Sequence, residues 1–588
     1  MRPETRILEH LAFLYGSDRA EQVWPRLEKR LSSFRERNPG LRASETAPAE
    51  RLTERDVFLI TYGDQVTEPG NPPLHTLAEV LEQHIAGIVT GVHLLPFFPY
   101  SSDDGFSVID YTTVDPELGT WADIERLGRS FRLMFDAVIN HISAESAWFR
   151  AFIDGRRKYQ DYFITVEPST DLSDVVRPRA RPLLAPVQTA EGEKLVWTTF
   201  SPDQIDLNYA NPDTLLDIID VLLLYVERGA EVIRLDAIAY LWKEIGTSCI
   251  HLEETHRVVR LFRAVLDAVA KHVILITETN VPHEENVSYF GNGYDEAQMV
   301  YQFSLPPLVL HTFHTGDATH LATWAAGLTT PSDSTTFFNF LASHDGVGVR
   351  PVEGILTPRE IEVLVDRTRE HGGYVSYKTN ADGSESVYEL NISYFDALSD
   401  PNGDESLEIQ VARFLASQAI MLSLAGVPGV YFHSLFGSRS HHKGVETTGR
   451  YRSINREKLQ CRTLEQALAD QSSLRHRVFY PYLDLIRARA SHPAFHPGAA
   501  QRVLLPDATG GTSLFALLRT SIAGDRSVLC LHNISSTHQP LRTNLRALVV
   551  PDGDGFQDLI SGAVYPACDD GLGVTIKPYQ VLWLEPLT

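Results

Sequence analysis

Two charged residues stand at the end of a short apolar run, EVIRLDAIAY, from Glu231 to Tyr240. The apolar residues of the run are typical of a buried parallel strand, and Arg234 and Asp236 fall where that strand ends. Ionised side chains in such a place are costly unless they are paired or used in chemistry. A structural ion pair and a reactive carboxylate held by an arginine both fit, and this run alone does not separate them.

Three further strand-like runs end in residues of the same kind. HVILITETN carries Glu278, FFNFLASHD ends in His344 and Asp345, and MFDAVINH carries Asp136, Asn140 and His141. In a barrel of parallel strands the carboxyl ends converge on one mouth, so the four runs predict one pocket with several acids. No group of residues in the sequence has the spacing that metal ligands show. These acids therefore indicate acid/base and nucleophilic chemistry on an acetal, with no metal or organic cofactor.

In these four motifs and their order, the sequence resembles the α-amylase superfamily of retaining α-glucosidases and transglucosidases. The resemblance implies that Asp236 is the nucleophile, Glu278 the general acid/base and Asp345 the transition-state stabiliser.

That chemistry sets requirements for the carboxyl groups. Glu278 must be protonated to assist the leaving oxygen, so we expect its pKa to lie above that of a free Glu. Asp236 must be ionised to attack the anomeric carbon, and Arg234, two residues earlier on the same strand face, should hold it so. A retaining mechanism predicts that the two carboxyl groups lie ~5 Å apart.

The elements that position these residues predict an α/β fold: a (β/α)8 TIM barrel with inserted subdomains, a helical N-terminal cap and a small C-terminal β domain. In the N-terminal cap, Leu8, Leu11 and Tyr15 are expected to share one helix face. The expected segments are a helical extension (1–53), the first part of the barrel (54–143), an inserted domain (144–205), the middle part of the barrel (206–347), a second insertion (348–401), the last part of the barrel (402–496) and the β domain (497–588).

A turn-rich loop after the second barrel strand, YSSDDGFSVIDYTTVDPELG, narrows the resemblance to the sucrose phosphorylase subfamily. By itself DDG is an ordinary turn. The resemblance implies that Asp103 holds the distal hydroxyls of the glucosyl ring and that Phe106 lines its face. It further assigns the glucosyl and acceptor subsites to Phe200, Gln204, His141, His344 and Arg452, the last of these in GRYRSINREK and bridging to Asp103.

The inserted stretch VVRPRARPLL places Arg177, Arg179 and Arg181 among prolines. Exposed basic loops are usually only solvated, but this one stands out in a chain of net charge -24, and Arg binds phosphate and carboxylate in a bidentate manner. The resemblance implies that Arg179 and Tyr388 bind phosphate. Glu389 stands where sucrose phosphorylases have Gln, which argues against fructose as the acceptor.

Over its whole length, including the helical N-terminus and SVYELN, the chain resembles glucosylglycerate phosphorylases more than sucrose phosphorylases. This implies a glycosyltransferase that carries out reversible phosphorolysis of 2-O-α-D-glucosyl-D-glycerate to α-D-glucose 1-phosphate and D-glycerate. The alternatives are a sucrose phosphorylase or another α-glucoside phosphorylase or transglucosidase of the subfamily, and a hydrolase with the same acids. A non-catalytic glycan-binding relative is disfavoured, because such proteins lose their acids.

Composition restricts the partners. The net charge of -24 over 588 residues argues against nucleic acid and anionic membranes, leaving a small glucoside and inorganic phosphate. The four cysteines form no CxxC and no disulfide framework, and no signal peptide or spanning stretch is apparent, so we expect a cytoplasmic protein. The sequence makes no prediction of oligomeric state.

Overall fold

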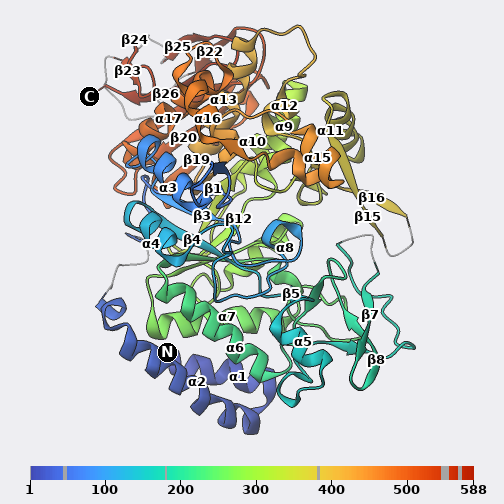
Figure 1. Cartoon of the computed structure of the whole chain (residues 1–588). Helices are drawn as coiled ribbons and strands as arrows, with labels where there is room; N and C mark the ends of the chain where they lie inside the picture. The colour runs from blue at the N-terminus through green and yellow to red at the C-terminus, as the bar shows by residue number, and fades with distance from the viewer. Residues whose placement is uncertain are drawn as a thin grey trace.

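The computed structural model describes residues 2–43, 50–178, 182–380, 384–543, 555–566 and 572–587. Eight parallel strands close into a barrel in the order β1-β17-β13-β12-β11-β10-β4-β3, which confirms the predicted fold (Figure 1). The strands are β1 (Phe58–Thr61), β3 (Gly91–Leu94), β4 (Arg132–Ala137), β10 (Ala230–Leu235), β11 (Ile274–Thr277), β12 (Met299–Tyr301), β13 (Thr336–Phe340) and β17 (Val427–Tyr431).

Aromatic side chains fill the interior of the barrel. The rings of Phe58 and Phe338 meet edge to face with centroids 6.3 Å apart. Gly91 on β3 makes room for the first ring, because a Cβ there would lie 2.3 Å from Phe58. Gly429 on β17 does the same for Phe338, with a Cβ contact of 2.4 Å. The small and large residues together close the barrel around a packed core.

Helices surround the barrel, and their ends carry local stop and start signals. Asn211 caps the N-terminus of α6 (Pro212–Glu227), where its side chain accepts a hydrogen bond from the backbone N–H of Asp213. Thr120 and Asp123 form a capping box at α4 (Trp121–Ser130). Further helices of the barrel part include α3 (Pro73–His84), α7 (Glu253–Val269), α9 (Leu305–Thr315), α10 (Thr319–Ala326), α13 (Leu407–Ser423), α16 (Cys461–Ala469) and α17 (Leu474–Ala490).

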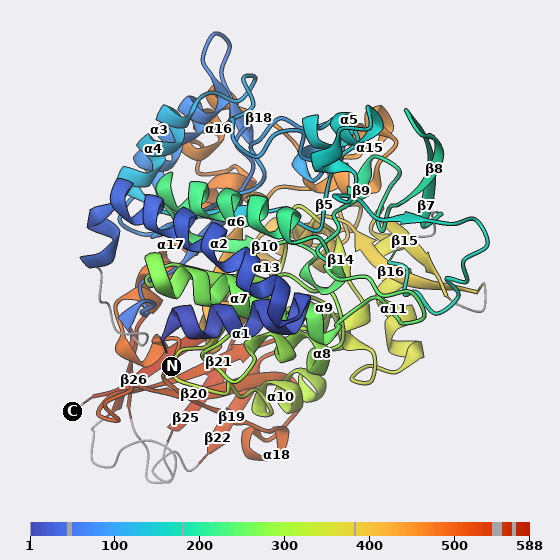
Figure 2. The ribbon, with the colours of Figure 1, turned by 90° about the horizontal axis from the view of Figure 1, so that it is seen from below.

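Two N-terminal helices, α1 (Pro3–Tyr15) and α2 (Ser17–Arg37), lie across α7 and α6 on the outside of the barrel (Figure 2). The second helix buries Val23, Leu27, Leu31 and Phe34, which lie at helical spacing on one face. The predicted face of the first helix is only partly right. Its buried side carries Ile7, His10 and Leu11, so it is turned toward Ile7 relative to the predicted face, and Leu8 and Tyr15 are partly exposed.

Two insertions stand beside the barrel mouth. The first follows β4 and contains β5 (His141–Ser143), α5 (Ala147–Ile153), the antiparallel sheet β6 (Thr165–Val166), β8 (Gly192–Trp197) and β7 (Leu184–Thr189), and then β9 (Gln204–Asp206), which returns to pair with β5. The second follows β13 and contains β14 (Val347–Gly348), α11 (Pro358–Glu370), the hairpin β15 (Tyr374–Thr379) and β16 (Glu385–Asn391), and α12 (Tyr394–Leu398). The residue boundaries given above for these domains stay predictions.

The C-terminal part is a β domain at the end of the molecule opposite the N-terminal helices (Figure 1). Its main sheet has six strands in the order β19-β20-β21-β26-β23-β24. These strands are β19 (Ala500–Leu504), β20 (Leu514–Thr520), β21 (Ser527–Asn533), β26 (Val581–Pro586), β23 (Gly555–Asp558) and β24 (Val564–Pro566). A separate pair is formed by β22 (Gln539–Thr543) and β25 (Leu572–Ile576).

Among the described residues, no helix is both long and apolar enough to cross a membrane. Cys249, Cys461 and Cys530 are unpaired thiols, and Cys568 lies outside the described residues.

Candidate active site

Arg234 holds two of the predicted carboxylates at the carboxyl end of β10. Its Nη1 lies 2.8 Å from Oδ1 of Asp236 and also bonds Asp136, while Nη2 lies 3.8 Å from Oε2 of Glu278. Asp136 is held from its other side by Nε2 of His93 at 2.7 Å. The backbone N–H of Ala237, directly after Asp236, donates to Glu278 at 3.0 Å. The ends of β10 and β11 therefore bring the predicted nucleophile and general acid/base to one guanidinium.

Burial separates these carboxyls from ordinary surface acids. Desolvation raises the pKa of Glu278 to about 7, with Arg234 opposing the shift and Asp236 adding to it. Desolvation also raises the pKa of Asp236 to about 6, although Arg234 again opposes it. The two pKa values stand in the order that the chemistry needs, because a proton is retained by Glu278 while Asp236 is ionised.

Asp345 lies among arginines rather than beside one. Burial would raise its pKa, but Arg452 at 2.5 Å, with His344 and then Arg456 at 3.6 Å, holds that pKa well below its usual value. The imidazole of His344 approaches Asp345 at 3.5 Å, yet burial lowers the pKa of His344 to about 3. The ring is therefore neutral near pH 7, and Asp345 is a permanent anion at the mouth.

The residues predicted to surround the glucosyl ring form one wall. The ring of Phe106 stacks on His344 with centroids 4.7 Å apart. The carbonyl of Phe106 accepts hydrogen bonds from His141 and Gln204, each at 2.9 Å. Phe200 completes the wall, 5.2 Å from the ring of His141. Apolar ring faces beside hydrogen-bonding groups are what a sugar ring requires.

A cavity of about 300 Å³ opens outside this wall. Asp103, Phe200, Gln204, Glu389 and Arg452 line it, and Arg452 connects it to Asp345. Sequence reasoning missed the other lining residues, which are Ser102, Ser201, Ser376, Gly449, Arg450, Tyr451 and Arg456. Tyr388, one residue before Glu389 on β16, is buried and does not line this cavity.

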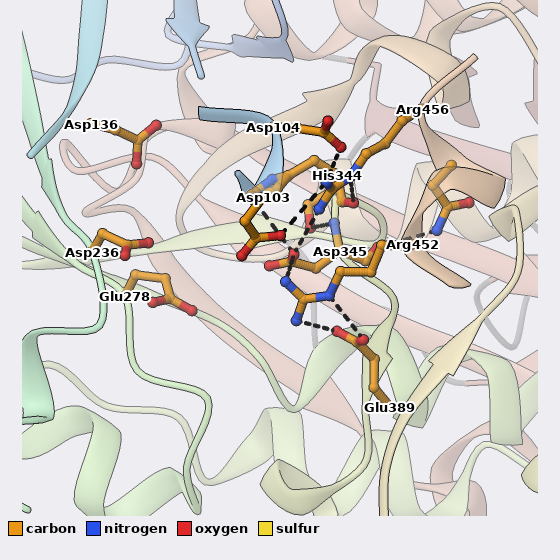
Figure 3. Close-up of polar contacts among 12 residues, drawn as sticks. Asp103, Asp104, Asp136, Asp236, Glu278, His344, Asp345, Glu389, Arg452 and Arg456 are labelled. Carbon is orange, nitrogen blue, oxygen red and sulfur yellow. Dashed lines mark hydrogen bonds and ion pairs between the residues drawn. The ribbon is translucent and has the colours of Figure 1, made fainter. Parts of the chain in front are cut away.

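The sequence prediction gave Arg452 the bridge to Asp103, and the structure corrects it. The guanidinium of Arg452 instead donates hydrogen bonds to both carboxylate oxygens of Glu389, at 2.9 and 3.1 Å, and forms an ion pair with Asp345. Arg456, four residues later, bonds Asp104 and approaches Asp103 at 4.0 Å (Figure 3). The motif GRYRSINREK holds both arginines, and its letters alone do not tell which of them reaches the loop.

The predicted phosphate residue Arg179 lies outside the described residues, and so does Arg181 on the same loop. Arg177, at the described edge of that loop, is exposed. Arg450 in the cavity wall is also exposed, and its guanidinium makes no hydrogen bond or ion pair with any part of the chain that the structure describes. Within the same part, no group of three acids, histidines or cysteines is placed to hold a metal ion.

The closed barrel and its three mouth acids define an α-amylase type of enzyme, and a family model described as the alpha amylase catalytic domain matches residues 83–347. The crystal structure of sucrose 6F-phosphate phosphorylase from Thermoanaerobacter thermosaccharolyticum aligns with a TM-score of 0.71 at 25% identity, covering 89% of this chain and 98% of that one.

Two curated relatives match nearly end to end. The glucosylglycerate phosphorylase of Allomeiothermus silvanus is 53% identical over 99% of both chains. That of Spirochaeta thermophila is 49% identical over 100% of this chain and 99% of its own. The chain belongs to the glucosylglycerate phosphorylase family of glycoside phosphorylases.

Proposed function

We propose that the protein catalyses reversible phosphorolysis of 2-O-α-D-glucosyl-D-glycerate, giving α-D-glucose 1-phosphate and D-glycerate with retention at the anomeric carbon. The observation that carries the proposal is the 53% identity to the glucosylglycerate phosphorylase of Allomeiothermus silvanus over 99% of both chains. In this chain the three acids are all present and lie at the barrel mouth.

In the first step, Glu278 donates its proton to the glycosidic oxygen as the bond from that oxygen to the anomeric carbon breaks. An ionised carboxylate oxygen of Asp236 forms the new bond to the same carbon, and glycerate leaves. Asp345, held anionic by Arg452, stabilises the positive charge that develops on the sugar ring.

In the second step, a phosphate oxygen attacks the anomeric carbon from the side that glycerate has vacated. Glu278, now ionised, takes the proton of the attacking phosphate, and the bond to Asp236 breaks. Two inversions leave the glucosyl unit in its original α configuration.

Both glycerate and phosphate are anions, so their shared site needs a cation. Arg450 supports this role because it lines the cavity and its guanidinium makes no ion pair within the described residues. Arg179 stays the candidate that the sequence predicts for this role, and Tyr388 stays a predicted phosphate contact. Both carboxylate oxygens of Glu389 accept hydrogen bonds from Arg452, so we infer that Glu389 orients this arginine. The remaining lone pairs of the carboxylate would accept hydrogen bonds from the hydroxyl groups of glycerate.

The proposed partners are therefore a small α-glucoside and inorganic phosphate, with no nucleic acid, no membrane and no resident cofactor. We propose the cytoplasm as the location, where both phosphate and sugar phosphates are present. Glu389 argues against fructose as the acceptor, because the resemblance implies Gln at this position in the enzymes that release fructose.

The test is a panel of donors with inorganic phosphate. Glucosylglycerate, sucrose and glucosylglycerol are each supplied, and formation of glucose 1-phosphate is followed. We expect kcat/KM for glucosylglycerate to exceed that for sucrose by at least about a hundredfold, as for a site built around a charged acceptor group. Preference for sucrose would overturn the glycerate assignment, and turnover that ignores phosphate would overturn the phosphorylase assignment.

A further inference from the structure

One buried lysine beside the site has no part in the steps above. Lys243 lies in the loop that follows the Asp236 strand, and its side chain is 2% exposed. Its Nζ lies 2.5 Å from Oδ2 of Asp206 and donates to Oδ1 of Asn140 at 2.8 Å. Asp206 ends β9 of the first insertion, and Asn140 follows β4 of the barrel. One ammonium therefore joins three segments that meet at the mouth.

These contacts fix the orientation of the Asn140 amide. An ammonium only donates, so the carbonyl oxygen of Asn140 must face Lys243. A carboxylate only accepts, and Nδ2 of Asn140 lies 3.1 Å from Oδ2 of Asp206. Both neighbours demand the same orientation. The second hydrogen of Nδ2 then points at Nδ1 of His141, which lies 3.2 Å away.

The orientation of Asn140 in turn selects the tautomer of His141. Nδ1 accepts from Asn140, so in the neutral ring the proton must be on Nε2. The opposite side of the ring agrees, because Nε2 lies 2.9 Å from the carbonyl oxygen of Phe106, which can only accept. The amide nitrogen of Gln204 donates to the same carbonyl at 2.9 Å and lies farther from Nε2 of His141, at 3.2 Å. Burial lowers the pKa of His141, which keeps the ring neutral.

We propose that Lys243, Asp206 and Asn140 are positioning residues for glucosyl transfer, which set the tautomer and ring orientation of His141 and anchor the backbone of Phe106. The position of Phe106 also affects the catalytic acids, because its ring stacks on His344, the residue next to Asp345. The inference rests on the proposed function only in that a glucosyl unit is transferred, and it is independent of which acceptor is used.

The competing explanation is that Lys243 and Asp206 form an ion pair that only stabilises the fold. The Asn140→Asp variant distinguishes this explanation from a positioning role in glucosyl transfer. The variant has nearly the same shape and still offers Lys243 an acceptor, but it presents a second acceptor to His141 in place of the donor. We expect kcat for an α-glucosyl fluoride to fall at least about tenfold per folded enzyme, because every donor contacts the same glucosyl pocket. The KM for phosphate should be unchanged. A structural role predicts wild-type kcat in every variant that folds.

Lys243→Met with Lys158→Met provides the matched lysine pair. Lys158 also forms an ion pair, 2.7 Å from Asp217, but its side chain is 53% exposed on the outside of the molecule. Lys158→Met should keep the kcat and the melting temperature of the wild type. Lys243→Met should lose kcat by a similar factor to Asn140→Asp, and it should also lose stability because Asp206 is left buried without its cation.

A readout on the wild type does not depend on how any variant folds. Nitrogen-15 NMR of labelled histidine, with the His141 resonance assigned from a His141→Gln sample, should show the proton on Nε2. A proton on Nδ1, or a folded Asn140→Asp with wild-type kcat, overturns the proposal. Failure of the proposed function would look different: the wild type would hydrolyse the fluoride but show no turnover that depends on phosphate.

Discussion

Asp236 carries the covalent step, so removing its charge should stop turnover while the fold remains. Asp236→Asn changes little volume and leaves Arg234 paired with Asp136. We expect the steady-state rate with every glucosyl donor to fall at least about a thousandfold, as for loss of a covalent catalyst. Circular dichroism provides the check on folding. A folded variant that retains more than about a tenth of the wild-type rate would remove Asp236 from this role.

Glu278 sets the pH dependence. Catalysis needs Asp236 ionised and Glu278 protonated, and their pKa values are raised to about 6 and about 7, so kcat/KM should rise through about 6 and fall above about 7. Glu278→Gln cannot donate a proton and should fail with glucosylglycerate, but an α-glucosyl fluoride should restore much of the first step. With that fluoride, the alkaline fall in kcat/KM should be absent. An unchanged alkaline limb in the variant would assign it to another group.

At the scale of elements, Arg456 should hold the glucosyl-binding loop in place. Asp103 and Asp104 have φ angles of 55° and 49°, in the left-handed region that costs energy for residues other than glycine. Arg456 bonds Asp104 and donates to the carbonyl of His344 at 2.8 Å, so it joins this loop to the end of β13. Arg456→Gln should release the loop and raise KM for the glucoside at least about tenfold.

The control for Arg456 lies two residues away. Lys458 pairs with Asp64 at 2.5 Å on a partly exposed side chain, so Lys458→Gln should leave KM within about twofold of the wild type, as is usual for surface ion pairs. If steady-state kinetics give both variants the same KM as the wild type, Arg456 does not position the loop.

The elements themselves were predictable, because four of the barrel strands have a strong apolar pattern and end in residues that the chemistry requires. The partners of long side chains were not. Arg452 and Arg456 have the same chemistry and lie four residues apart on an irregular segment, so only the fold shows that Arg456 reaches Asp104. Lys243 was missed for a similar reason, because WKEIG is typical of an exposed loop and burial depends on Asp206, which comes from the distant insertion.

At the scale of the whole molecule, the two N-terminal helices should act on stability and not on chemistry. They bury Leu27, Leu31 and Phe34 completely, and Arg6 pairs with Asp267 of α7 at 2.8 Å, on the outside of the barrel. Removing residues 1–37 should lower the melting temperature by more than about 4 °C and promote aggregation, because the apolar sides of α6 and α7 become exposed. Calorimetry and light scattering measure both effects.

An exposed ion pair of α2 supplies the comparison for this deletion. Arg30 lies 2.8 Å from Asp220, so Arg30→Ala should cost no more than about 1 kcal/mol of unfolding free energy. The truncated protein should keep the wild-type kcat per folded molecule. A truncated protein that melts at the wild-type temperature and stays monodisperse would contradict the stabilising role.

The central claim is a retaining phosphorylase whose covalent intermediate forms on Asp236, and the anomeric configuration of the first product tests it most directly. Proton NMR should follow glucosylglycerate and phosphate with the wild-type enzyme from the start of the reaction. The account predicts α-D-glucose 1-phosphate as the first-formed product, appearing at the same rate as free glycerate. Formation of β-D-glucose 1-phosphate, or of free glucose at the rate of glycerate release, would contradict it.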